Sequence, residues 1–254
     1  MKLVLPGLFC FLVILHAEAQ VKIHSHNDYA KPRPFYEALE NKVFSMEADV
    51  FPVNDQLFVA HNKTDITKER SLEAMYIQPI LKQFALHKKT VLDDSSYTFS
   101  LLVDIKEDPA TALKLLIDLL NKYPQCFDRR RNPKAVQVII TGDQGNQKEW
   151  NNYPSYIYFD GKPYEDYSPA ALDRIAIVSD NFFKYFGQKN SSAGDRSYFL
   201  QTIKWAHDTH RPIRFWAAPD NETAWMKLVA QGVDIINTDH VEECRRRFPL
   251  SIEH

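Results

Sequence analysis

Two carboxylates stand two residues apart in an apolar stretch at residues 46–51. Because the side chains of a β-strand alternate between its faces, a strand here would direct Glu47 and Asp49 to the same side. Two ionised carboxylates on one face repel each other unless one is protonated or a cation lies between them. Their oxygens are the ligands that a hard divalent cation prefers. The stretch therefore indicates either part of a metal site or a half-buried strand with an acidic solvent face.

A second pair with the same spacing, Asp104 and Lys106, ends another apolar stretch. Asp104 would add a third carboxylate, which is enough to hold one Mg²⁺ or Ca²⁺ ion. Zinc fits less well, because the set is rich in oxygen and the histidines lack i, i+4 spacing. Lys106 beside a metal would favour an anionic substrate, although Asp104 and Lys106 could also form an ordinary ion pair.

Two histidines, His26 and His61, follow other strand-like stretches. Histidine changes its charge near neutral pH, so two of them beside a cation and a lysine suit general acid and base catalysis at phosphorus. Taken singly, His26 could be a core histidine with satisfied hydrogen bonds, and His61 a surface loop residue.

The elements that must position these residues alternate between strand-like and helix-like stretches. The strand-like stretches are residues 21–26, 43–51, 100–106, 136–141, 155–159, 174–179, 213–217 and 234–238. The helix-like stretches are residues 33–39, 71–87, 110–122, 199–207 and 222–231, and residues 57–61 form a short extended arm. Repeated strand–helix units indicate parallel strands.

Eight parallel strands in a chain of 254 residues close most economically into a single (β/α)8 TIM barrel of the α/β class. The alternative is an open doubly wound sheet, which usually carries a glycine-rich phosphate loop after its first strand. The chain has only seven glycines and no such loop. We therefore predict one barrel domain at residues 20–254.

Barrel enzymes place their chemistry at the carboxyl ends of the strands. Polar residues stand at that end of nearly every predicted strand, where charged groups cost free energy unless they are paired or metal-bound. Besides the residues above, this end has Asn27, Lys162, Trp216 and Asn237. Trp216 could instead pack in the core, and Asn237 could cap the rim. Because such explanations would all have to hold at one end of one barrel, we favour a shared active site.

The composition is that of an ordinary globular protein, with 44% hydrophobic and 25% charged residues. A net charge of -2 gives no reason to expect nucleic acid or an anionic membrane as the main partner. The basic clusters at residues 129–131 and 245–247 are short and suit solvated helix ends. We expect a monomer without a nucleic-acid partner, whose contact with membranes is at most peripheral.

The N-terminus has the features of a signal peptide, which we predict at residues 1–19. Lys2 gives a positive start, residues 3–15 are mostly apolar, and residues 17–19 have the small-x-small pattern of a cleavage site. The apolar core is too short for a comfortable membrane span, and no second hydrophobic segment follows. We therefore expect the mature chain to be exported, either secreted or periplasmic.

Two cysteines, Cys126 and Cys244, remain after the predicted signal peptide. An exported protein could pair them in a disulfide. Two cysteines alone carry too little information to decide whether they pair, and they make a poor metal site without a nearby histidine motif.

These motifs together resemble the glycerophosphodiester phosphodiesterase and phosphatidylinositol-phospholipase C superfamily of TIM-barrel phosphodiesterases. The similarity runs over nearly the whole mature chain and is carried by His26, Glu47-x-Asp49, His61, Asp104-x-Lys106 and residues 232–239. It is greatest to a secreted bacterial and fungal branch that begins with a His-x-His-Asn-Asp-Tyr motif. The fungal altered inheritance of mitochondria proteins belong to that branch.

Two motifs depart from the glycerophosphodiesterase pattern. The family has His-Arg-Gly, with the arginine on the phosphate, where this chain has His26-Asn27-Asp28. The family has Glu-x-Lys where this chain has Asp104-x-Lys106. The aspartate form, with Trp216 and Asn237, resembles the sphingomyelinase D (phospholipase D) branch, but the cysteine-bearing loop of that branch is not evident. The resemblance therefore implies the fold and the reaction type better than the substrate.

The resemblance also implies a role for each site residue. Glu47, Asp49 and Asp104 would hold one divalent metal. His26 would be the general base, or the nucleophile in the chemistry of the sphingomyelinase D branch, and His61 the general acid that protonates the leaving alcohol. Lys106 would stabilise charge on the phosphoryl oxygens, and Asn27 would contact the metal or the phosphate. Trp216 and Asn237 would close the far side of the pocket. Lys162 would bind a second anionic group.

The expected function is hydrolysis of a glycerol- or lipid-derived phosphodiester. An adjacent hydroxyl on the substrate would instead give a cyclic phosphate, as in the sphingomyelinase D branch. A non-catalytic binding barrel remains a second alternative. A glycosidase is a third, and it would need two carboxylates across a sugar cleft rather than three around a metal. The sequence leaves open the head group and the choice between Mg²⁺ and Ca²⁺.

Overall fold

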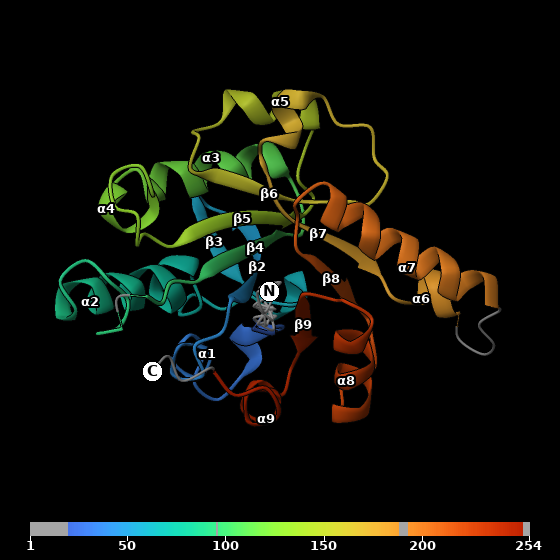
Figure 1. Cartoon of the computed structure of the whole chain (residues 1–254). Helices are drawn as coiled ribbons and strands as arrows, with labels where there is room; N and C mark the ends of the chain where they lie inside the picture. The colour runs from blue at the N-terminus through green and yellow to red at the C-terminus, as the bar shows by residue number, and fades with distance from the viewer. Residues whose placement is uncertain (1–19, 95, 188–192, 251–254) are drawn as a thin grey trace, which may run out of the picture.

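The computed structural model describes residues 20–94, 96–187 and 193–250 (Figure 1). The predicted signal peptide at residues 1–19 lies outside these residues. Eight parallel strands form a barrel, and helices surround it. Neighbouring strands pair in the order β1, β2, β4, β5, β6, β7, β8 and β9, and β9 pairs back with β1. The predicted single (β/α)8 barrel is thus confirmed, because an open sheet would leave two unpaired edges.

The barrel strands are short and follow the predicted order. They are β1 (Lys22–Ser25), β2 (Ser45–Val53), β4 (Ser100–Ile105), β5 (Gln137–Gly142), β6 (Ile157–Gly161), β7 (Ile175–Asn181), β8 (Ile213–Trp216) and β9 (Ile235–Thr238). The extended arm is β3 (Gln56–Val59), which pairs antiparallel with the outer half of β2 and returns the chain to the barrel rim.

The longer helices follow the strands they connect. They are α2 (Gln78–Leu86), α3 (Pro109–Leu120), α7 (Ala193–Asp208), α8 (Glu222–Ala230) and α9 (Val241–Arg247). Shorter helical segments are η1 (Asp28–Ala30), α1 (Tyr36–Glu40), η2 (Lys63–Asp65), η3 (Glu73–Ile77), α4 (Pro124–Phe127), η4 (Gln147–Asn152), α5 (Pro169–Leu172) and α6 (Phe183–Phe186).

Helix starts agree with the capping signals in the sequence. The Asp108 side chain accepts a hydrogen bond from the Thr111 N–H, and Pro109 occupies the first turn of α3. The Asn221 side chain accepts from the Ala224 N–H and begins α8 in the same way. Gly232 follows α8 with a φ of 92°, a conformation that favours glycine after a helix.

Two predicted elements have different boundaries because of proline. The strand predicted at residues 155–159 runs instead over Ile157–Gly161, since a turn at Pro154 accepts a hydrogen bond from the Ile157 N–H at 3.0 Å. The helix predicted at residues 33–39 begins only at Tyr36, because the residue before a proline disfavours helical geometry and Pro34 follows Arg33.

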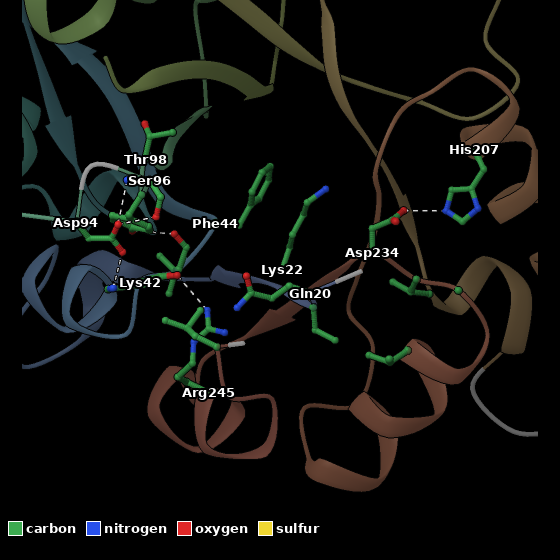
Figure 2. A pocket seen from close by; sticks show the side chains of 17 residues that line it. Gln20, Lys22, Lys42, Phe44, Asp94, Ser96, Thr98, His207, Asp234 and Arg245 are labelled. Carbon is green, nitrogen blue, oxygen red and sulfur yellow. Dashed lines mark hydrogen bonds and ion pairs between the residues drawn. The ribbon is translucent and has the colours of Figure 1, made fainter. Parts of the chain in front are cut away.

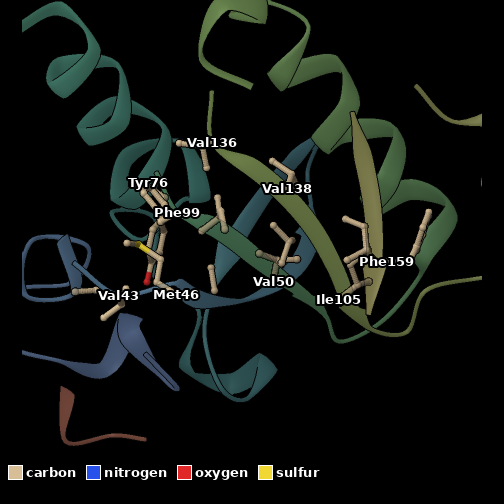
Figure 3. Packing of buried hydrophobic residues seen from close by; sticks show 14 of the residues in the cluster. Val43, Met46, Val50, Tyr76, Phe99, Ile105, Val136, Val138 and Phe159 are labelled. Carbon is tan, nitrogen blue, oxygen red and sulfur yellow. The ribbon is translucent and has the colours of Figure 1, made fainter. Parts of the chain in front are cut away.

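The main hydrophobic core fills the space between the barrel and its helices (Figure 3). Val50, Ile105 and Val138 face it from the sheet, and Tyr76 packs from the helical side. Full burial of one such aliphatic side chain stabilises the fold by about 1.5–3 kcal/mol. This packing fixes the strands, and with them the direction of the residues on the opposite strand face.

The inside of the barrel is layered from apolar to polar. Leu102, Ile139, Ile177 and Ile235 form a small buried cluster. Two residues further along three of these strands, the same face has Thr141, Ser179 and Asn237. The barrel interior therefore becomes polar toward the carboxyl ends of its strands.

The structure also bears on the pairing of the two cysteines and on membrane-spanning helices. Cys126 in α4 and Cys244 in α9 are both buried and do not form a disulfide. Among the described residues, no helix has the length and apolar character that a membrane span requires.

Candidate active site

Three carboxylates meet at the carboxyl end of the barrel. Glu47 and Asp49 come from one face of β2, and Asp104 pairs in register with Asp49 from the neighbouring β4. One ligand oxygen of each residue lies within 4.8 Å of the others. Within the described residues this is the one group of acidic, histidine or cysteine side chains with such spacing. The structure thus brings together the three predicted metal ligands.

Burial and mutual repulsion disfavour ionisation of two of the three carboxylates, Asp49 and Asp104. Burial, with the charge of Glu47, raises the pKa of Asp49. Burial raises the pKa of Asp104 to about 6, with Asp49 and Glu47 acting in the same direction and Lys106 against them. The Lys106 Nζ lies 2.7 Å from Asp49 Oδ2 and 3.1 Å from Asp104 Oδ1. One lysine only partly offsets three clustered carboxylates, so the donor set suits a divalent cation.

A glycine makes room for Asp104. Gly142 ends β5 with a φ of 70°, and a Cβ built there would lie 2.4 Å from Asp104 Oδ1 and 2.5 Å from the Ile105 carbonyl oxygen. Both the backbone conformation and the space exclude a side chain. Gly142 was not among the predicted site residues, because its role depends on strand register.

His26 lies on one side of the carboxylates and is held by an aspartate. Its Nδ1 lies 2.8 Å from Asp239 Oδ1, and its Nε2 lies 3.8 Å from Glu47 Oε2. Burial lowers the pKa of His26, but the Asp239 hydrogen bond and the Glu47 charge outweigh it and raise the pKa overall. Asp239, one residue past β9, is not among the predicted site residues.

A second histidine nearby, His24, has a different environment. It is fully buried, and its Nδ1 lies 2.8 Å from Ser45 Oγ. Burial and the charge of Arg214 lower the pKa of His24 to about 3, so it stays neutral at pH 7. His24 therefore supports the strand packing, whereas His26 reaches the rim.

His61 lies on the other side of the carboxylates, after β3. Its side chain is 67% exposed, and its Nδ1 lies 3.5 Å from Asp49 Oδ2. The hydroxyl of Tyr29 lies 3.2 Å from the same nitrogen. The two histidines therefore flank the carboxylate group, with His26 beside Glu47 and His61 beside Asp49.

Asn27 joins these two sides. Its backbone N–H donates to Glu47 Oε2 at 3.1 Å, and its side-chain Nδ2 lies 3.0 Å from His26 Nδ1. Its Oδ1 lies 2.9 Å from the Tyr29 hydroxyl. The backbone at Asn27 is left-handed, with a φ of 46°, which asparagine tolerates better than most residues.

The remaining predicted residues are less directly connected to the carboxylates. Trp216 ends β8 with 44% of its surface exposed at the rim. The side-chain oxygen of Asn237 accepts a hydrogen bond from Arg214 inside the barrel. Lys162 follows β6 as an exposed residue, and among the described contacts only its backbone N–H makes a hydrogen bond, to Tyr167.

A buried polar layer beneath the site was not predicted. Arg214, 4% exposed, donates to Ser179 at 2.9 Å and to Asn237 at 3.2 Å, and it pairs with Asp160 at 3.0 Å. The sequence signal is an arginine between the apolar residues Ile213 and Phe215, on a predicted strand.

A large cavity lies at the opposite end of the barrel (Figure 2). It has a volume of about 980 Å³, and Lys22 of β1 and Phe44, just before β2, lie in its wall. Its acidic groups already have partners, because Asp94 pairs with Lys42 at 2.6 Å and Asp234 with His207 at 2.9 Å. The carboxylate group at the rim is therefore the better candidate for chemistry.

Comparison with known families places the chain among phosphodiesterases. Residues 14–159 match the model of the "AIM6-like phosphodiesterase domain", and residues 212–242 match the "Glycerophosphoryl diester phosphodiesterase family". An Altered inheritance of mitochondria protein 6 homolog of Arthroderma benhamiae is 28% identical over 90% of this chain and 84% of its own. Altered inheritance of mitochondria protein 6 of Kluyveromyces lactis is 34% identical over 87% of this chain and 70% of its own.

Solved structures share the fold at low sequence identity. A putative glycerophosphodiester phosphodiesterase from Galdieria sulphuraria aligns with a TM-score of 0.57 at 12% identity, over 91% of this chain and 98% of its own. An Oleispira antarctica phosphodiesterase in complex with the product sn-glycerol-3-phosphate aligns with a TM-score of 0.54 at 10% identity. The alignment covers 90% of this chain and 96% of that chain. The family match extends over more than half of the chain, so this protein belongs to the AIM6-like branch of the glycerophosphodiester phosphodiesterase-like superfamily.

Proposed function

We propose that this protein is a divalent-metal-dependent phosphodiesterase that hydrolyses a glycerol- or lipid-derived phosphodiester. The observation that carries the proposal is the arrangement of three carboxylates and Lys106 at one rim of the barrel, flanked by two histidines on opposite sides. An acid and a base on opposite sides of an anion-binding group are what in-line displacement at phosphorus requires.

Glu47, Asp49 and Asp104 would hold the metal, for which we propose Mg²⁺ or Ca²⁺. The burial of Glu47 and Asp49, the short distances between the ligand oxygens and the raised pKa of Asp49 and Asp104 support this assignment. When bound, the ion would neutralise charge on the phosphoryl oxygens and favour ionisation of an adjacent hydroxyl. Lys106 would remain beside Asp49 and Asp104, where its ammonium can bind a phosphoryl oxygen.

His26 is the proposed general base. Asp239 holds its Nδ1, so Nε2 is the nitrogen that accepts the proton of the attacking water or hydroxyl as the new O–P bond forms. His61 is the proposed general acid, and it gives its proton to the leaving alcohol oxygen as the old P–O bond breaks. Asn27 would hold His26 and Glu47 at a fixed spacing through its contacts with both.

The substrate is proposed from chemistry and similarity together. A structural neighbour was solved with sn-glycerol-3-phosphate, which supports a small phosphodiester as the class of substrate. Trp216 on the rim offers an apolar surface to the alcohol part of a substrate, and the exposed Lys162 offers a charge to a second anionic group. We also propose that the protein is exported. N-terminal sequencing of the mature chain tests this, with a start near Gln20 expected.

Cyclic phosphate formation is the second candidate reaction. The Asp104-x-Lys106 motif, with Trp216 and Asn237, favours it, because these residues resemble the sphingomyelinase D branch. It requires a free hydroxyl next to the phosphate in the substrate. Phosphorus NMR of the products distinguishes a cyclic diester from a monoester.

The proposal is tested with a panel of phosphodiesters after chelation, with Mg²⁺ and Ca²⁺ added back separately. We expect hydrolysis that disappears on chelation and returns with one of the metals. His26→Ala and His61→Ala should each lower the rate by about a hundred-fold or more, as removal of a general acid or base does.

His207→Ala is the matched control. His207 also pairs with an aspartate, but at the opposite end of the barrel, so this variant should keep the wild-type rate. Hydrolysis that survives chelation, or full activity in both site variants, would contradict the proposal.

A further inference from the structure

We propose that Tyr29 is the positioning residue for His61 and that its hydroxyl links the general acid to the metal ligand Asp49. The catalytic role in this inference rests on the proposed function. The hydrogen bonds from which it is argued are those of this chain's own residues. Tyr29 is the last residue of the His-x-His-Asn-Asp-Tyr motif, and neither the proposed reaction nor the family resemblance assigns it a role.

The Tyr29 hydroxyl lies between three groups. It is 2.8 Å from Asp49 Oδ2, 2.9 Å from Asn27 Oδ1 and 3.2 Å from His61 Nδ1. A phenol has a single proton to donate. The carboxylate is the shortest of these contacts, and a charged acceptor forms the stronger hydrogen bond, so the hydroxyl donates to Asp49. Its oxygen is then free to accept a hydrogen bond from His61.

This direction decides which nitrogen of His61 carries the proton. To donate to the Tyr29 oxygen, the neutral imidazole must be protonated at Nδ1, which leaves Nε2 without a proton. The nitrogen that gains and loses the catalytic proton is therefore Nε2, on the side of the ring away from Asp49. Tyr29 sets both the tautomer and the direction of the general acid.

His61 has little else to hold it. Its side chain is 67% exposed, and in the described structure its ring nitrogens contact only Tyr29 and Asp49. An exposed imidazole without these contacts would be free to rotate. Misplacement of a catalytic group by about 1 Å can lower a rate by about a hundred-fold.

Tyr29 itself is fixed by its loop. It is 3% exposed, and its carbonyl accepts a hydrogen bond from Arg70 at 2.5 Å. The preceding residue, Asp28, is fully buried and accepts from Ser25 Oγ at 2.8 Å and from Tyr76 at 2.9 Å. Loss of the Tyr29 hydroxyl alone should therefore leave the ring and the loop in place.

The first test reads the tautomer of His61 in the metal-free protein by long-range ¹H–¹⁵N correlation spectra at alkaline pH. We expect the Nδ1–H form in the wild type, and a change toward the Nε2–H form in Tyr29→Phe. His61→Ala identifies the signals, and Tyr36→Phe is the control, since no described hydrogen bond involves that hydroxyl. An Nε2–H tautomer in the wild type would overturn the inference without any need for a variant.

The second test compares leaving groups. Tyr29→Phe should lower kcat by about ten-fold for a diester with an alkyl alcohol leaving group, which needs a general acid. For a p-nitrophenyl diester, whose leaving group departs without a proton, the loss of rate should be several-fold smaller. An equal loss on both diesters would overturn the inference. If the wild type cleaves neither diester, the proposed function fails, and the tautomer measurement still decides the role of Tyr29.

Discussion

At the scale of single residues, surroundings distinguish two histidines that are only two positions apart. His24 and His26 lie on the same face of the first strand and its extension. Burial keeps His24 neutral and packed against Ser45, whereas His26 reaches the rim and binds Asp239. The catalytic proposal therefore depends on depth in the barrel, which the sequence does not state.

Asp239→Asn tests the proposed base at this scale. Because Asp239 raises the pKa of His26, its loss should lower that pKa. His26 must be unprotonated to act as a base, so the acid limb of the pH–rate profile should move to lower pH. The plateau rate should fall by about ten-fold or more, since a weaker and less oriented base accepts a proton less well.

The full pH profile of kcat/KM in the presence of metal measures both effects. Asp234→Asn is a poor control because Asp234 also accepts from the Ile213 backbone, so His207→Ala serves again. An unchanged acid limb would show that Asp239 does not act on the base.

At the scale of elements, a single strand end decides whether Asp104 can join the proposed metal site. Gly142→Ala would place a Cβ against Asp104 Oδ1 and the Ile105 carbonyl. We expect the variant to lose metal-dependent activity by about a hundred-fold, as loss of correct positioning does. The thermal shift caused by the added metal should also become smaller.

Gly145→Ala is the matched control for this prediction. Gly145 has a similar φ of 66°, but the nearest atom to an added Cβ is 3.8 Å away, on Pro109. Both variants should lose stability of about 1–2 kcal/mol from the left-handed backbone. Only Gly142→Ala should lose metal binding, and equal effects of the two variants would contradict the role given to Gly142.

The sequence predicts the strands well because the signals for them are local. Apolar stretches and turn residues placed all eight barrel strands in order, and the alternation of side chains put Glu47 and Asp49 on one face. Partners that arise from loop conformation could not be predicted. Tyr29 and Asp239 meet the two histidines only because η1 and the end of β9 bend toward the rim.

At the scale of the whole molecule, the sequence left the two cysteines undecided. Cys126 and Cys244 lie in separate helices, are buried and are not paired. Burial raises the pKa of Cys126 to about 11 and that of Cys244 to about 12. Since the thiolate is the reactive form, neither thiol should react readily near pH 8 in the native protein.

A thiol-specific reagent checks this prediction. The native protein should react at least about a hundred-fold more slowly than the unfolded protein, as expected when the thiolate fraction and the access are both low. Both thiols should become reactive in denaturant without a reductant. A disulfide detected by mass spectrometry, or rapid reaction in the native state, would contradict the structure.

The barrel closes where its first strand pairs with its last, and this affects when the proposed activity can arise during biosynthesis. β1 pairs with β9, and His26 binds Asp239, although the two residues are 213 positions apart. The three carboxylates are all present once the chain has been made as far as β4, but the proposed base, His26, is not oriented until the last strand has docked. Such distant contacts form late in folding, because closing a long loop costs entropy. A growing chain therefore has its acidic group early and its proposed base oriented last, so the proposed catalysis requires the closed barrel.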